Sequence, residues 1–98
     1  MQQATLNTEQ KLMAMKALAG DENCHIWMLK PGQWFISLRL WEIPRNGMLS
    51  STMAGGKNIE EAINHLWDEI TNSEYIVFHA YREGRRHVKW NGFMWVDV

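Results

Sequence analysis

The sequence has little that could fix a fold covalently or hold it in a membrane. Cys24 is the single cysteine among 98 residues, so no internal disulfide can form, which is typical of a reducing compartment. No apolar run approaches the ~18–20 residues that a membrane-spanning helix needs. The first ten residues, MQQATLNTEQ, are polar and unlike a signal peptide. We therefore expect a cytoplasmic protein that makes no membrane contact.

An excess of charge and recognisable catalytic motifs are also missing. The formal net charge is −1, so the molecule as a whole has no electrostatic preference for nucleic acid or acidic membranes. No Ser/His/Asp or Cys/His arrangement carries a local catalytic signature, and no group of residues has the spacing of a metal site. We therefore predict a protein that is not an enzyme and that needs no cofactor or metal.

The glycine pair Gly55-Gly56, followed by Lys57, is the nearest approach to a phosphate-binding loop. The segment lacks the Gly-x4-Gly-Lys-Ser/Thr pattern of such loops. The helix that we expect after it opens with Glu60 and Glu61, which would repel a phosphate. We reject a phosphate site here.

Apolar and aromatic side chains are what the chain has in quantity. Hydrophobic residues make up 46% of the sequence and six residues are tryptophan, which argues against disorder. A chain of this size can bury one core but is too short for two. We expect a single domain over residues 1–98, with a flexible N-terminus at residues 1–6.

Capping boxes predict two helices. Asn7 with Gln10 begins a helix over residues 8–19, which ends at Gly20. Asn58 with Glu61 begins a second helix, whose apolar residues recur at helical spacing. That apolar stripe consists of Ile59, Ala62, Ile63, Leu66 and Ile70, with Trp67 at its edge.

Alternating apolar residues between turn signals predict the strands. They cover residues 25–30, 33–43, 48–53 and 74–81, and a closing hairpin covers residues 88–98. The order of elements is therefore α-β-β-β-α-β-β. Antiparallel hairpins with both helices packed on one face give a single two-layer domain of the α+β class.

The closing hairpin turns on Asn91-Gly92, the preferred pair for a two-residue type I′ turn. This turn sets Trp90 opposite Phe93, and Val88 opposite Trp95. For the preceding hairpin, a two-residue loop 83–84 and a three-residue loop 82–84 are both compatible with the sequence. We prefer the three-residue loop because it gives the more apolar core face: Ile76, Phe78, Val88, Trp90, Phe93 and Trp95.

The opposite face of the sheet mixes aromatic side chains with bases, a composition typical of binding surfaces. Alternation along residues 33–43 places Arg39 and Trp41 on this face. An ordinary wet sheet face, or a face covered by a dimer partner, is the alternative. The residues that we predict to bind a partner are Tyr75, His79, Tyr81, Arg82, Arg85, Arg86, His87, Lys89, Arg39 and Trp41.

The charges in the second half of the chain are separated by sign. Residues 58–81 contain five acids and no Lys or Arg, whereas residues 82–89 contain four bases and one acid. A molecule with two differently charged sides is therefore expected. On the preferred register His79 and His87 face each other across the hairpin, but two histidines without a third ligand make a poor metal site.

The stretch Trp34–Ile70, with Glu60-Glu61-Ala62 opening its helix, resembles the HicB antitoxin family and its double-stranded-RNA-binding-like relatives. Those proteins run through three strands and a glycine into a helix that begins with two acids and an alanine. The resemblance implies this fold order and a partner-binding module. The HicB ending Pro-x-x-Pro-Gly-Cys is replaced here by residues 43–47, IPRNG. Acids also replace the Lys-Lys-x-Ala-Lys start that grips RNA, which argues against double-stranded RNA as a ligand.

From these features we predict a small non-enzymatic interaction protein of phage or mobile-element type. It would bind and inhibit a larger protein partner through the aromatic and charged face of the sheet, with homodimerisation as a further option. The alternative is a nucleic-acid-binding module that uses the exposed aromatics and the basic hairpin, residues 82–89.

Overall fold

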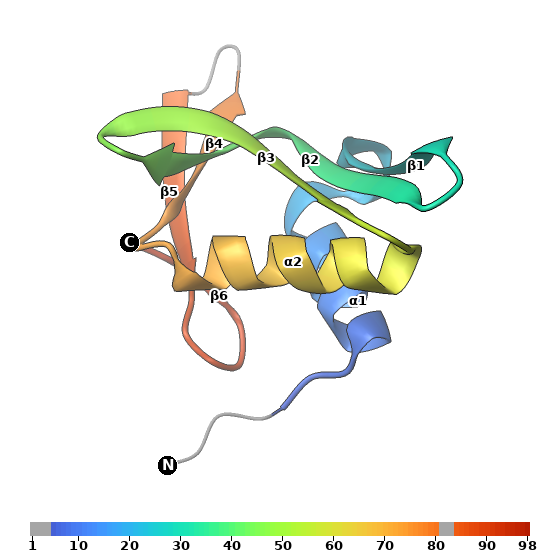
Figure 1. Cartoon of the computed structure of the whole chain (residues 1–98). Coiled ribbons are helices and arrows are strands. Elements are labelled where there is room, and N and C mark those ends of the chain that lie inside the picture. The colour runs from blue at the N-terminus through green and yellow to red at the C-terminus, as the bar shows by residue number, and fades with distance from the viewer. Residues whose placement is uncertain (1–4, 81–83) are drawn as a thin grey trace.

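The fold is an antiparallel sheet covered on one face by two helices, as the computed structural model shows for residues 5–80 and 84–98 (Figure 1). The predicted order of elements is confirmed, and the closing hairpin, which that order counts once, supplies two strands. In chain order the elements are α1 (Thr8–Ala19), a 3-10 turn (Asp21–Asn23), β1 (Cys24–Lys30), β2 (Gln33–Arg45), β3 (Met48–Gly56), α2 (Ile59–Asn72), β4 (Ile76–Ala80), β5 (Gly84–Trp90) and β6 (Trp95–Asp97).

β2 is the organising strand of the sheet because it is long enough to pair with three others. β3 pairs along one edge of β2, at residues 34–37 and again at 42–45. β1 pairs with residues 33–38 and β4 with residues 41–42, so these two strands follow each other along the opposite edge. β5 and β6 then extend the sheet beyond β4. Residues 39–40 lie where the partner of β2 changes from β1 to β4.

Both helices begin at the residues that the sequence predicts. The Asn7 side chain accepts a hydrogen bond from the Gln10 N–H at 2.8 Å, and the Gln10 side chain accepts one from the Asn7 N–H at 2.9 Å. In α2 the Asn58 side chain accepts from the Glu61 N–H at 2.8 Å. The carboxylate of Glu61 bonds to the Lys57 N–H, one residue before the position expected in a capping box.

The glycine pair at the end of β3 is explained by packing. A Cβ atom on Gly56 would lie 2.5 Å from the backbone nitrogen of Ala62, so the strand can approach the first turn of α2 this closely only with glycine there. This close approach carries the chain directly from the sheet into the helix that covers it.

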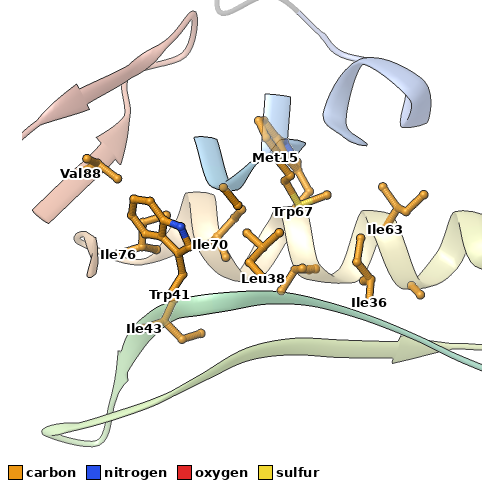
Figure 2. Close-up of a cluster of buried hydrophobic side chains, with 13 residues drawn as sticks. Met15, Ile36, Leu38, Trp41, Ile43, Ile63, Trp67, Ile70, Ile76 and Val88 are labelled. Carbon is orange, nitrogen blue, oxygen red and sulfur yellow. The ribbon is translucent and has the colours of Figure 1, made fainter. Parts of the chain in front are cut away.

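The core lies between the two helices and the sheet (Figure 2). The α2 stripe is buried as predicted at Ala62, Ile63, Leu66 and Ile70. Ile59 is 40% exposed, because it is the first residue of the helix and lies at its end. α2 also contributes Trp67. From the other elements the core receives Met15, Ala19, Ile36, Leu38, Trp41, Ile43, Ile76 and Val88.

Three tryptophans close the core beside α1. The rings of Trp67, Trp90 and Trp95 meet edge to face, with centroids 5.0 to 5.9 Å apart. The Trp95 indole N–H donates a hydrogen bond to the Ala14 carbonyl at 3.0 Å, which ties β6 to α1. Trp90 and Trp95 therefore belong to the core side of the sheet, as predicted.

The predicted register of the closing hairpin is wrong. Trp90 pairs with Trp95, and four residues, 91–94, form the connection. Gly92 has a positive φ of 106° whereas Asn91 does not, and a type I′ turn requires both. The Asn91 side chain instead accepts hydrogen bonds from the backbone N–H groups of Phe93 and Met94, at 2.8 and 2.9 Å. This wider turn leaves Phe93, predicted for the core, 56% exposed.

The preceding hairpin also differs from the preferred register. Ile76 pairs with Val88, and Ala80 pairs with Gly84, so Gly84 begins β5. Residues 81–83 of the loop lie outside the described residues, as do residues 1–4 of the N-terminal segment predicted to be flexible. The shift is by two residues, so the predicted faces are kept: Ile76 and Val88 are buried, and Phe78 packs against the core.

Candidate functional site

A large bulge in the middle of β2 is the main irregularity of the sheet. Ser37 pairs with Met53, and Glu42 pairs with Ser51, so the four β2 residues between them lie opposite Thr52 alone. Leu40, at the centre of the bulge, has a φ of 73°, a left-handed conformation that costs a non-glycine residue roughly 1–2 kcal/mol. Strained residues and bulges are concentrated beside functional sites, which makes this segment a candidate.

The side chain of Thr52 closes the bulge from β3. Its hydroxyl lies 2.7 Å from the Leu38 carbonyl oxygen and 3.0 Å from the Trp41 carbonyl oxygen. These two carbonyls flank the bulge and share the single proton of the hydroxyl. Because Thr52 is 1% exposed, this side chain supplies a buried donor that the backbone of β3 does not provide there. The bulge is therefore a fixed part of the fold.

The bulge moves Trp41 from the predicted outer face into the core. Strict alternation places Trp41 with Arg39 on the outside, but the inserted residues reverse the alternation, so Ile36, Leu38, Trp41 and Ile43 all point inward. Trp41 is 3% exposed and lies beside Ile70 and Ile76 (Figure 2), with its ring centroid 5.0 Å from that of Phe78. The Trp41 side chain is therefore buried and not exposed as predicted, although Trp41 is among the residues that line a groove along the bulge.

A groove with a volume of about 610 Å³ lies along the bulge. Most of its lining side chains come from the sheet face that points away from the helices, which we call the open face. Its walls are the exposed apolar side chains of Trp27 on β1, Leu40 on the bulge and Met53 on β3. The polar groups around them are His25, Ser37, Arg39, Glu42 and Ser51.

An aromatic row leads from the groove across the open face. Phe35 of β2 pairs with Trp27 of β1 on one side and with Gly55 of β3 on the other. The Trp27 and Phe35 rings are stacked, with centroids 5.5 Å apart and planes 23° apart. A Cβ on Gly55 would lie 3.0 Å from the Phe35 ring, so the glycine gives this ring room to lie against the sheet. Trp27, 38% exposed, therefore presents a supported aromatic surface to solvent.

The charges of α2 and of the open face differ in sign, as the sequence predicts. On the open face Arg39, Arg85 and Lys89 are exposed, and Glu42 is the acid beside the groove. Among the described residues, Arg39 has no ion pair, which leaves its guanidinium available to a partner. The helix α2 carries acids and no base: Glu60, Glu61, Asp68 and Glu69.

The β4–β5 part of the open face is less exposed than predicted. Tyr75 is half-buried, and its ring lies 4.9 Å from the ring of His87. Val77, between the cross-strand neighbours Glu42 and His87, is 1% exposed. Tyr75 and His87, which were expected to project here, therefore pack against each other.

The remaining predicted site residues divide into three groups. Arg85 and Lys89 lie on the open face as expected, whereas Arg86 lies on the opposite face and pairs with Asp97 at 2.8 Å. Tyr81 and Arg82 lie outside the described residues. His79 pairs with Arg85 in the backbone register, so the predicted facing pair of His79 and His87 is wrong.

Within residues 5–80 and 84–98, no group of three or more His, Cys, Asp or Glu side chains is arranged to hold a metal ion. No helix in the same ranges is long and apolar enough to span a membrane. His65, at the edge of α2, lies 2.8 Å from the Gly55 carbonyl oxygen through its Nδ1 and joins the helix to β3.

Sequence reasoning missed Trp27, Leu40 and Met53, the apolar walls of the groove. The signal available for Trp27 is that β1 is apolar at consecutive positions, more than one buried face requires. Nothing comparable marks Leu40, because the bulge contains neither glycine nor proline. The groove is a consequence of the bulge and could not be located without it.

Comparison with models of protein families, with curated proteins and with solved structures finds no significant match to this chain. Within Trp34–Ile70, the stretch that resembles HicB antitoxins, the structure has the strands β2 and β3 followed by α2, and the strand β1 precedes it. The resemblance rests on the residues of the stretch Trp34–Ile70 alone.

Proposed function

We propose that this protein is a non-enzymatic module that binds a larger protein through the groove on the open face. The observation that carries the proposal is the groove itself, an apolar depression of about 610 Å³ beside a bulge with a strained backbone. Trp27, Leu40 and Met53 expose large apolar side chains around it, and apolar or aromatic side chains seated in such depressions are the usual centres of protein interfaces.

The chemistry of the groove favours a particular kind of partner segment. Its walls suit a large apolar side chain, and the exposed Arg39 suits a carboxylate next to that side chain. A folded scaffold holds these groups in place, since Thr52 closes the bulge and Phe35 supports Trp27. A preformed site of this kind reduces the entropy lost on binding.

A nucleic-acid-binding module is the second candidate, favoured by the exposed bases Arg85 and Lys89 on the same face. Single-stranded nucleic acid needs aromatic rings open to base stacking. Here Tyr75 already packs against His87, and one face of Trp27 is occupied by Phe35. We therefore place protein binding first.

Inhibition of the partner, and a phage or mobile-element origin, remain predictions from the size and composition of the chain. The same applies to a cytoplasmic location. Identification of the partner, and not the geometry of the groove, would test these three predictions.

Capture of partners from the lysate of the native host, with quantification by mass spectrometry, tests the proposal. Met53→Glu places a charge in the groove, and Met48→Glu is the matched control, because Met48 is an exposed methionine on the same strand outside the groove. We expect the wild type and Met48→Glu to enrich the same protein, and Met53→Glu to lose it. Recovery of no protein by the wild type, or equal recovery by all three chains, would contradict the proposal.

Binding to oligonucleotides separates the two candidates. Single- and double-stranded oligonucleotides are titrated with the protein at low salt and again at higher salt. Because phosphate contacts release counterions, nucleic-acid binding would weaken steeply with salt and with loss of Arg85 and Lys89. We expect no binding at low salt, and tight salt-dependent binding would favour the second candidate.

A further inference from the structure

β1 is an edge strand whose outer side is open. Among the described residues it pairs with β2 alone, and it ends the strand order of the sheet (Figure 1). An edge strand presents a row of backbone N–H and C=O groups to any other strand that can approach it. Natural edge strands are usually protected from such pairing by proline, by charged residues or by short length.

These protections are missing from β1 over most of its length. The strand has seven residues and contains no proline. Its one charged side chain, Lys30, and its one irregularity of pairing with β2, between Met28 and Lys30, both lie at its end. Trp27, Met28 and Leu29 are 38%, 49% and 68% exposed, so both faces of the strand show apolar side chains near the edge. A long apolar edge of this kind favours pairing with another strand.

We propose that the partner of this edge is a second copy of the chain, paired antiparallel through β1 about a two-fold axis at Ile26. Lys30 at the end of β1 is exposed, as are Asp21 and Glu22 just before its start, and none of the three side chains has an ion pair among the described residues. Antiparallel pairing brings Lys30 of each copy to the acids of the other, twice in a symmetric dimer. Parallel pairing would place like charges together.

The register about Ile26 follows from the same charges. It sets Lys30 opposite Glu22, and Met28 opposite Cys24, with Trp27 opposite His25. The two-fold axis is perpendicular to the joined sheet, so the open faces of both copies point to the same side. The dimer uses the backbone edge of β1 and the groove uses side chains on its open face, so His25 and Trp27, which line the groove, also become cross-strand neighbours in the dimer. The inference holds whatever the groove binds, because it is argued from the edge and its charges alone.

Light scattering after size-exclusion chromatography, over a wide range of concentration, tests the dimer. Met28→Lys adds a charge to the edge, and Met94→Lys is the control, since Met94 is also exposed but lies in the β5–β6 connection. We expect the wild type and Met94→Lys to reach twice the chain mass of 11.5 kDa, and Met28→Lys to remain at the monomer mass. A wild-type monomer at every concentration, or a Met28→Lys dimer like the wild type, would overturn the proposal.

Oxidation of Met28→Cys tests the register. Within one copy, positions 24 and 28 of a strand lie roughly 13 Å apart, which is too far for a disulfide. Across the proposed interface they are direct neighbours, so oxidation should give a covalent dimer, and adding Cys24→Ser should abolish it. Circular dichroism checks that each variant is folded. A folded Met28→Cys chain that stays monomeric after oxidation overturns this register.

Discussion

The hydroxyl of Thr52 stabilises the bulge on which the groove depends. It is buried and lies 2.7 and 3.0 Å from the carbonyl oxygens of Leu38 and Trp41. Thr52→Val keeps the shape of the side chain and leaves these two acceptors without their donor. We expect a loss of roughly 1–3 kcal/mol in the free energy of unfolding. Urea denaturation measures the loss, and an unchanged midpoint with an unchanged slope would contradict the assigned role.

The single thiol provides a second test at the scale of one residue. Burial raises the pKa of the Cys24 thiol above its ordinary value, with Lys16 opposing the shift and Asp21 adding to it. The thiolate is the reactive form, so we expect a thiol reagent to react more slowly with folded protein than with denatured protein at mildly alkaline pH. Equal rates would show that the thiol is not protected.

The same pKa shift has a defined sign for stability. The folded state favours the neutral thiol, so the stabilisation is fully present below the pKa of the unfolded chain. It is lost as the pH rises through the higher pKa of the folded chain. Removal of the thiol by Cys24→Ser should therefore abolish this part of the alkaline destabilisation, which thermal unfolding at several pH values would detect.

In β5, two adjacent residues lie on opposite faces of the sheet, so their substitution distinguishes an effect on stability from an effect on the surface. Trp90 meets Trp67 and Trp95 edge to face, whereas its neighbour Lys89 is exposed on the other face. Trp90→Ala should lower the free energy of unfolding by about 3–5 kcal/mol, and Lys89→Ala should change it little. Chemical denaturation of both variants checks this, and a reversed order of effects would mean that the assignment of faces is wrong.

The elements also show what local sequence can and cannot predict. The bounds of α1 follow from Asn7, Gln10 and Gly20, because capping depends on residues three or four apart. The turn at Asn91-Gly92 has an equally familiar sequence, but the Asn91 side chain binds the backbone N–H groups ahead of it and selects a four-residue connection. The Asn91-Gly92 pair therefore predicts the position of the turn correctly but not the number of residues in it.

For the whole molecule, the fold class and the two-layer arrangement could be predicted because amphipathic helices and apolar hairpins have few ways to bury their faces. The site could be predicted only in part. Alternation, with the preferred hairpin loop, predicts the positions of Arg39, Arg85 and Lys89 on the open face, whereas the bulge makes the predicted position of Trp41 wrong. The bulge is fixed by Thr52, which is eleven residues from Trp41 in the chain, and no local pattern specifies such a contact.

The charge distribution is likewise a property of the whole molecule. The acids of α2 lie in the helical layer and the exposed bases of β2 and β5 lie on the open face, although the net charge is only −1. A partner with acidic groups beside an apolar side chain is therefore attracted to the sheet layer and repelled by the helical layer, which orients the encounter.

Chemical-shift mapping by NMR tests the central claim most directly, with the isotope-labelled protein titrated by the partner that the capture experiment identifies. We predict that the largest changes fall on the Trp27 indole N–H, on the backbone of residues 37–42 and on Met53, with little change at the Trp67 indole. Changes concentrated on α1 and α2, with the groove residues unmoved, would contradict the account.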